Sequence, residues 1–192
     1  MILVVGLGNP GPRYAETRHN LGFMVVERLV AEAGGHWRSG LSGRIASIAV
    51  EGQRLLALET EGYMNESGLS VRRVADFYKL VPSELLVLHD ELDLGFGEIR
   101  LKLGGGDAGH RGIRSIISEL GGADFARLRL GIGRPPADSA LEPSDYVLEA
   151  FAPTERTDLP EVIERARGAV TLVVGSGLDR AMNVVNQRTK TQ

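Results

Sequence analysis

Apolar residues recur along the chain with two different spacings, one typical of helices and one typical of strands. Spacings of three or four positions predict helices over residues 20–33, 66–79, 112–120, 160–175 and 178–188. Short apolar or alternating runs predict strands over residues 2–6, 44–50, 54–59, 85–88, 98–103 and 126–132. Because helices and strands are interleaved, we expect residues 1–192 to form a single α/β domain with a twisted mixed β-sheet flanked by helices.

The same spacings predict which side chains face the core. In the helix over 66–79, the side chains expected to point inward are Leu69, Val74, Phe77 and Tyr78. The run Leu-Leu-Val-Leu at 85–88 is apolar without interruption, which is typical of a strand covered on both faces. We therefore expect this strand to lie in the middle of the sheet.

Two of the predicted strands carry basic residues at alternate positions. The side chains expected to point outward are Arg100 and Lys102 on the strand 98–103, and Arg127 and Arg129 on the strand 126–132. The side chains expected to point inward on the same strands are Ile99, Leu101, Leu103, Leu128 and Leu130. If the two strands are close in space, the four basic side chains form a local cationic patch.

Composition places the chain among ordinary soluble globular proteins, because 43% of its residues are hydrophobic and 24% are charged. The sequence has no cysteine, which excludes a disulfide scaffold, a thiolate zinc site and a cysteine nucleophile. The apolar N-terminal run lacks the basic region and the cleavage site of a signal peptide. No run reaches the roughly 18 apolar residues of a membrane helix, so we expect a cytoplasmic protein without membrane contact.

The net charge restricts how a nucleic-acid partner can bind. The formal charge is −3 and the pI is about 5.8. Proteins that bind nucleic acids through an overall positive charge have a much higher pI. An RNA partner is therefore expected to bind through a local patch, such as the one predicted on the two basic strands.

The N-terminal loop contains a glycine pattern that matches a dinucleotide fingerprint. Gly6, Gly8 and Gly11 follow the first strand with the spacing G-x-G-x-x-G. A dinucleotide site needs a helix that begins within the motif, so that the helix N-terminus holds the pyrophosphate. Here Pro10 and Pro12 interrupt the loop, and the helical pattern begins only near residue 20. A nucleotide-dependent oxidoreductase therefore stays an alternative, and we expect no nicotinamide or flavin cofactor.

His19 and Asp90 are the first candidates for catalysis. His19 lies in a loop just before a helix, and histidine titrates near neutral pH, which suits a group that takes a proton from water. The alternative role is a histidine that only hydrogen-bonds the start of the helix. Asp90 lies at the carboxyl end of the apolar strand, where α/β sheets usually bind ligands. His89 points to the opposite face of that strand, so we expect that His89 and Asp90 do not share a role.

The sequence offers no protein nucleophile and no recognisable metal site. It has neither a cysteine nor a G-x-S-x-G serine elbow, which favours direct attack by water. His89, Asp90, Glu91 and Asp93 are clustered, but the H-E-x-x-H pattern and a Cys/His array are missing. Alternation along a strand separates neighbouring side chains, so we expect no bound metal.

Four blocks of the sequence follow one another in a characteristic order and spacing. They are G-L-G-N-P-G at 6–11 with Y-A-E-T-R-H-N-L-G at 14–22, Y-M-N-E-S-G at 63–68, H-D-E-L-D at 89–93, and K-L-G-G-G at 102–106 followed by Gly109 and His110. Through these blocks the chain resembles the bacterial peptidyl-tRNA hydrolases over most of its length.

This resemblance implies that the protein hydrolyses the ester bond between a peptide and tRNA, with water as the nucleophile and no cofactor. It implies that His19 is the general base, and that Asp90 orients His19 and stabilises its protonated form. His89 is then expected to have a structural role. It implies substrate contacts at six positions: Asn9, Tyr14, Met64, Asn65, His110 and Arg111. It also implies that Lys102 and Arg129 bind the 5′-phosphate of the tRNA.

The resemblance further implies the partner and the cellular role. The partner is peptidyl-tRNA, bound through its 3′ end and acceptor stem by a monomeric protein. The role is to recycle tRNA from peptidyl-tRNA that leaves the ribosome prematurely. A non-catalytic RNA-binding relative of the same fold remains the alternative, and turnover of peptidyl-tRNA distinguishes the two.

Arg111 departs from the family pattern, which usually has asparagine at this position. Arginine has five donors, no acceptor and a permanent charge, so it cannot replace the acceptor of an amide. It can donate to a peptide carbonyl, donate to the oxyanion formed by attack, or reach a phosphate group. The resemblance therefore leaves the role of Arg111 open, while His19 and Asp90 match the pattern.

Overall fold

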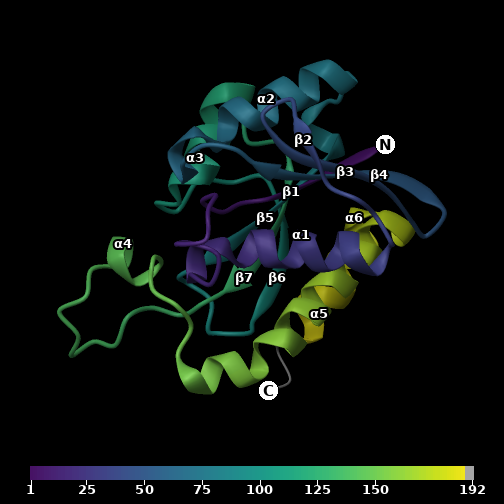
Figure 1. Cartoon of the computed structure of the whole chain (residues 1–192). Coiled ribbons are helices and arrows are strands. Elements are labelled where there is room, and N and C mark those ends of the chain that lie inside the picture. Colours follow the sequence, from purple (N-terminus) through teal and green to yellow (C-terminus); the bar gives the residue numbers. More distant parts are fainter. Residues whose placement is uncertain (189–192) are drawn as a thin grey trace.

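A mixed β-sheet crosses the middle of the molecule, and helices cover both of its faces (Figure 1). The computed structural model describes residues 1–188, and within them seven strands lie in the order β2-β3-β4-β1-β5-β7-β6. The strands are β1 (Ile2–Gly6), β2 (Arg38–Gly40), β3 (Gly43–Val50), β4 (Gln53–Thr60), β5 (Leu85–Glu91), β6 (Ile99–Leu103) and β7 (Ala126–Gly131). The expected α/β architecture with a mixed sheet is therefore confirmed.

The four strands in the middle of the sheet, β4, β1, β5 and β7, run parallel, so their carboxyl ends lie at the same end of the sheet. Parallel strands are usually covered on both faces, which is why they form continuous apolar runs. Every residue of β5 is buried, and β5 lies between β1 and β7, which confirms the central strand expected at 85–88. The antiparallel strands β3 and β6 flank this parallel unit.

Two groups of helices cover opposite faces of the sheet (Figure 1). The first group is α1 (Leu21–Glu32), α5 (Pro153–Ser176) and α6 (Leu178–Arg188), and the second is α2 (Ser67–Tyr78) and α3 (Arg111–Leu120). Successive residues of β1 point to the two sides, because Val4 belongs to the first core and Leu3 and Val5 belong to the second. A short helix, α4 (Pro143–Tyr146), lies in the connection between β7 and α5. Within residues 1–188, no helix combines the length and the apolar character needed to cross a membrane.

Gly22, in the first turn of α1, lies directly against the ends of β1 and β5. A Cβ atom at this position would be 2.4 Å from the carbonyl oxygen of Leu88 and 2.6 Å from the amide nitrogen of Leu7, so this approach requires glycine. The 3-10 turn before α1, Arg18–Asn20, is thereby held over the end of β5. This close packing brings His19 to the carboxyl end of the central strand.

Four of the expectations about which side chains are buried and which are exposed are wrong. Leu69 and Phe77 are 44% and 64% exposed, because the core face of α2 is centred on Val71 instead. Leu103 is 55% exposed, because it is the last residue of the edge strand β6. Arg127, which was expected on the outside, is only 3% exposed. The contacts of Arg127 belong to the site described next.

Candidate active site

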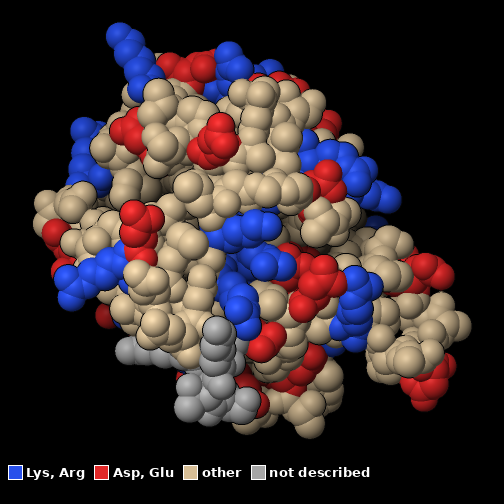
Figure 2. All heavy atoms as spheres, turned by 180° about the vertical axis from the view of Figure 1, so that it is seen from behind, with Lys and Arg blue, Asp and Glu red and all other residues tan. Residues whose placement is uncertain are grey.

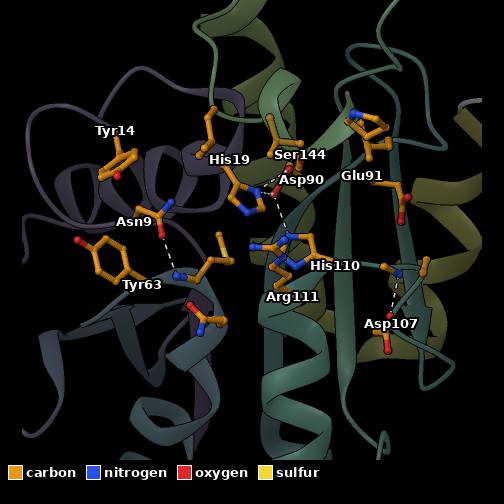
Figure 3. Close-up of a pocket in the computed structure, with 18 of the residues that line it drawn as sticks. Asn9, Tyr14, His19, Tyr63, Asp90, Glu91, Asp107, His110, Arg111 and Ser144 are labelled. Carbon is orange, nitrogen blue, oxygen red and sulfur yellow. Dashed lines mark hydrogen bonds and ion pairs between the residues drawn. The ribbon is translucent and has the colours of Figure 1, made fainter. Parts of the chain in front are cut away.

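A cavity of about 550 Å³ opens at the carboxyl ends of the parallel strands (Figure 3). Its walls come from the loop after β1, the 3-10 turns Arg18–Asn20 and Met64–Glu66, the end of β5, α4 and the start of α3. Eight of the ten residues expected at the site line this cavity: Asn9, Tyr14, His19, Met64, Asn65, Asp90, His110 and Arg111. The other two, Lys102 and Arg129, lie outside it on the neighbouring strands β6 and β7.

His19 and Asp90, which are 71 residues apart in the sequence, meet at the wall of the cavity. The Nδ1 atom of His19 lies 2.9 Å from each carboxylate oxygen of Asp90, and both side chains are buried. Nδ1–H therefore donates to the carboxylate. In the part of the chain that the structure describes, no residue hydrogen-bonds His19 Nε2. This nitrogen is thus available to accept a proton in the cavity.

A second imidazole, that of His110, also contacts Asp90. The Nδ1 atom of His110 accepts hydrogen bonds from the backbone N–H groups of Gly112 and Ile113, at 3.2 and 3.3 Å, and so caps α3. The ring therefore carries its proton on Nε2, which lies 2.9 Å from Asp90 Oδ1. The sequence reasoning expected His110 only as a substrate contact. The available signal was its position immediately before a helix, where a side-chain acceptor caps the helix.

Asp90 stays ionised although it is buried. Burial alone raises the pKa of this carboxyl group, but the facing imidazoles of His19 and His110 lower it. The balance holds the pKa of Asp90 well below its usual range. A fixed negative charge therefore lies directly behind His19, where it can stabilise positive charge that develops on the imidazole during proton transfer.

His89 lies on the other face of β5 and supports the site from behind. Its Nδ1–H donates to the backbone carbonyl of Asp90 at 2.8 Å, and its ring packs edge-on against His110 with centroids 4.9 Å apart. Burial lowers the pKa of His89 to about 3, so the ring is neutral at physiological pH. These contacts agree with the structural role expected for His89.

Asn9 is held in place by a second asparagine, Asn20. The backbone N–H of Asn9 donates to Asn20 Oδ1 at 2.8 Å, and Asn20 Nδ2 donates to the Asn9 carbonyl at 2.9 Å. The Oδ1 atom of Asn9 accepts a hydrogen bond from the backbone N–H of Met64 at 2.8 Å. Because its oxygen is occupied, Asn9 offers Nδ2 to the cavity as a donor. Asn20 was not predicted as a functional residue, although it directly follows His19.

Among residues 1–188, one group of ligand-type side chains is close enough to hold a metal ion: His19, Asp90 and His110, whose ligand atoms lie within 4.8 Å of one another. Only Asp90 belongs to the acidic cluster considered in the sequence. Both imidazole N–H groups point at the carboxylate, and the other nitrogen of His110 accepts backbone N–H groups. These hydrogen bonds fit proton transfer, whereas metal binding would need the two imidazole protons to leave.

Arg127 holds the glycine-rich loop that leads to His110. Its guanidinium donates to the carbonyl oxygens of Gly105 and Gly106, at 2.6 and 2.7 Å, and lies over the ring of Phe125. Strand alternation predicted the correct face for Arg127, but the loop folds over that face and buries it. Arg127 is therefore an internal anchor of the site and does not belong to the expected surface patch.

The remaining basic residues of β6 and β7, Arg100, Lys102 and Arg129, form what we call the cationic patch. The two strands are antiparallel neighbours, and Arg100 lies opposite Arg129. Arg129 forms an ion pair with Glu91 at 2.9 Å, and Lys102 is exposed. Figure 2 shows Lys and Arg side chains gathered in the middle of the rear face, where β6 and β7 lie in Figure 1.

Arg111 is the first residue of α3, and its side chain extends into the cavity toward His19 (Figure 3). Arg134, which also lines the cavity, is paired with Asp93. By contrast, the Arg111 guanidinium has no hydrogen-bond or ion-pair partner within residues 1–188. A guanidinium in this situation is available to a ligand.

Comparisons with known proteins agree on one family. Residues 3–192 match the family model described as Peptidyl-tRNA hydrolase. The chain is 51% identical to the peptidyl-tRNA hydrolase of Sorangium cellulosum over 99% of this chain and 86% of that protein. It is 48% identical to that of Mycobacterium avium, over 96% of this chain and 97% of that protein. The crystal structure of peptidyl-tRNA hydrolase from Acinetobacter baumannii superposes with a TM-score of 0.90 at 40% identity, over 97% of this chain and 94% of that chain.

Replacing Arg127 by methionine tests the anchoring of the glycine-rich loop. We expect a loss of roughly 2–4 kcal/mol of unfolding free energy, because two loop carbonyls lose their donors in a buried place. Urea denaturation followed by circular dichroism measures the change. The matched variant Arg129→Met removes a partly exposed ion pair and should cost roughly 1 kcal/mol or less. Equal losses in the two variants would contradict the anchoring role.

Proposed function

The chain belongs to the peptidyl-tRNA hydrolase family and hydrolyses peptidyl-tRNA, and we propose that His19 is the general base that activates the attacking water. The observation that carries this proposal is the contact between His19 Nδ1 and Asp90, which leaves Nε2 for a proton from the cavity. The products are the peptide, with a free carboxylate, and the tRNA with its 3′ hydroxyl.

In the proposed reaction, His19 Nε2 accepts a proton from a water molecule as the water oxygen attacks the ester carbonyl. The resulting tetrahedral intermediate collapses by breaking the bond to the ribose oxygen, which takes the proton back from His19. Asp90 keeps Nδ1–H in place and stabilises the imidazolium between these two steps. His110 donates to the same carboxylate and thereby keeps Asp90 oriented toward His19.

The uncharged side chains of the cavity position the substrate in this proposal. Asn9 donates through Nδ2 because its oxygen is occupied by Met64. Asn65 adds a second amide, and Tyr14 and Met64 give the wall its apolar surface. Positioning of this kind lowers the barrier because the ester is held where water can attack it.

Arg111 binds the peptide part of the substrate in this proposal. Its guanidinium lies on the cavity wall, has no partner among residues 1–188 and extends toward His19. A permanent donor at this place is suited to a peptide carbonyl and to the oxyanion of the intermediate. The acceptor role of an amide is lost at this position, so the attacking water must be held by other groups.

Lys102 and Arg129 of the cationic patch bind the 5′-phosphate of the tRNA in this proposal, while the 3′ end enters the cavity. The patch is local, which agrees with a chain whose net charge is −3. Phosphate contacts position the acceptor stem without reading its sequence. The protein acts as a monomer in the cytoplasm. There it recycles tRNA from peptidyl-tRNA that has left the ribosome prematurely. A non-catalytic RNA-binding role is disfavoured because His19 and Asp90 form a complete proton-transfer pair.

Replacing His19 by alanine should reduce kcat by roughly 10²–10⁴-fold, because a positioned general base is lost. Release of peptide from purified N-acetylaminoacyl-tRNA measures the rate, and a filter-binding assay should give an unchanged affinity for tRNA. His36→Ala provides the control, because His36 is exposed and lies outside the cavity. Turnover at the wild-type rate in the His19 variant would remove His19 from the mechanism.

Replacing Lys102 by glutamine should weaken tRNA binding and reduce the slope of log K against log salt by about one, because one phosphate contact is lost. The same change should have little effect on tRNA that lacks its 5′-phosphate. Lys79→Gln removes an equal charge from the end of α2, outside the patch, and serves as the control. If the two variants change the salt slope equally, the patch does not hold the 5′-phosphate.

Replacing Arg111 by methionine should lower kcat/KM for peptidyl-tRNA by roughly tenfold or more, because a charged donor to the peptide is lost. Arg111→Asn should recover part of the loss, since an amide retains a donor. If the replacement leaves kcat unchanged and only makes KM less dependent on salt, Arg111 contacts a phosphate group instead. Steady-state kinetics at two salt concentrations separates these results.

A further inference from the structure

A second cavity, of about 430 Å³, lies beside the catalytic cavity and shares Asn9 with it. We call it the Glu59 pocket; its lining includes Phe23, Met24, Glu27, Arg44 and Glu59. The loop after β1 lines both cavities, with Tyr14 in the first and Ala15 in the second. The segment after β4 does the same, with Tyr63 in the first and Glu61 in the second. The two cavities are therefore neighbours along two separate segments of the chain.

One polar atom of the Glu59 pocket is buried and lacks a hydrogen-bond partner among the described residues. Glu59 is 3% exposed, and its Oε2 accepts from Arg44 at 2.8 Å, but its Oε1 has no donor. Because buried polar groups are normally hydrogen-bonded, this oxygen indicates a place for a donor from outside the chain.

The charge of the pocket selects the sign of that donor. Its described lining has the carboxylates of Glu27, Glu59 and Glu61 but only one guanidinium, that of Arg44. Burial, together with the neighbouring carboxyl group of Glu27, raises the pKa of Glu59 to about 7, although Arg44 beside it lowers the pKa. A cation would stabilise the ionised carboxylate and donate to its free oxygen, whereas a phosphate group would be repelled.

The pocket also contains an apolar surface beside its carboxylates. Phe23 and Met24, from the first turns of α1, lie on the wall together with Pro10 and Pro12. Lysine and arginine side chains bury an apolar stem while their charged ends stay hydrogen-bonded. An apolar wall next to a buried carboxylate therefore complements a basic side chain.

The strand order sets the direction from which such a side chain arrives. Across the sheet, the order β4-β1-β5-β7-β6 places the catalytic cavity between Glu59, on β4, and the cationic patch, on β7 and β6. The two halves of an ester substrate leave the reacting bond in different directions. If the tRNA lies over the cationic patch, the peptide extends past Asn9 toward β4. In Figure 3, Tyr14 and Tyr63 lie on that side of Asn9, away from His110.

We propose that the Glu59 pocket is a subsite for a basic side chain, lysine or arginine, in the peptide part of the substrate. The proposal rests on the function proposed above. It adds a preference among peptides that the catalytic cavity alone does not provide.

The test compares three N-acetylated tetrapeptidyl-tRNAs. Each carries a single lysine, placed at a different one of the three positions before the esterified residue. Norleucine at the same position is the neutral control, because it keeps most of the stem without the charge. At one position we expect kcat/KM to be roughly tenfold higher for lysine than for norleucine. Glutamate at that position should be slower than norleucine.

Glu59→Gln should abolish the lysine preference and leave hydrolysis of the norleucine substrates close to wild type. Glu32→Gln removes the same charge from the exposed far end of α1 and should keep the preference. Equal rates for lysine and norleucine at all three positions in the wild type would overturn the subsite. A preference that survives in Glu59→Gln would overturn it as well.

A binding measurement separates the subsite from the reaction. Titration of isotope-labelled protein with N-acetyl-lysine methylamide should shift the amide resonances of Arg44 and Thr60 in the wild type but not in Glu59→Gln. The norleucine analogue should leave them in place. If no peptidyl-tRNA is hydrolysed while the lysine probe binds, the proposed function fails and the cation-binding pocket stands. If turnover is normal and the probe does not bind, only the subsite fails.

Discussion

The carboxylate of Asp90 is almost completely buried and therefore needs hydrogen-bond donors, and the arrangement of the site provides them. The carboxylate receives one imidazole N–H from His19 and another from His110. These donors come from the turn before α1 and from the start of α3, which lie on opposite faces of the sheet. One negative charge at the end of β5 therefore connects the three layers of the fold. The same charge provides the electrostatic support that His19 requires in its proposed role as general base.

The surrounding structure fixes each of the two imidazoles by a different device. On the side of His19, Gly22 allows α1 to approach the strand ends to a distance that any side chain would prevent. On the side of His110, Arg127 binds the carbonyls of the glycine-rich loop and thus fixes the start of α3. His89 fills the space behind with a neutral ring. The precision of the site thus depends on residues that do not line the cavity.

Local periodicity predicted most helices and strands, including the central strand and the helix after His19, because these depend on spacing within one segment. It could not predict contacts across the chain, so the pairing of His19 with Asp90 came from the family resemblance alone. Alternation placed Arg127 on the correct face of its strand but could not reveal that a loop would cover it. Phe77 was expected in the core for a different reason, because the spacing was assigned to the wrong helical phase; α2 buries the face of Val71 and leaves Phe77 exposed.

The capping role of His110 and the brace formed by Asn20 were missed for a related reason. Both residues hydrogen-bond to backbone groups whose positions exist only in the folded chain. The Glu59 pocket illustrates the same limit, since Arg44 and Glu59 meet through the pairing of β3 with β4, and the helix α1 closes the space beside them. Sequence identifies which groups can do chemistry, while the fold decides which of their atoms remain free.

The order of the strands has a consequence for how the protein meets its substrate. Four strand spacings, roughly 19 Å, separate β4 from β6. The carboxylates of the Glu59 pocket, near β4, and the cationic patch, on β6 and β7, are therefore farther apart than the Debye length of about 8 Å at physiological salt. The two groups of charges therefore act separately on an approaching polyanion, which is attracted near β6 and repelled near β4. In the proposed complex with tRNA, this difference turns the nucleic acid toward β6 before contact and raises the fraction of encounters that are productive.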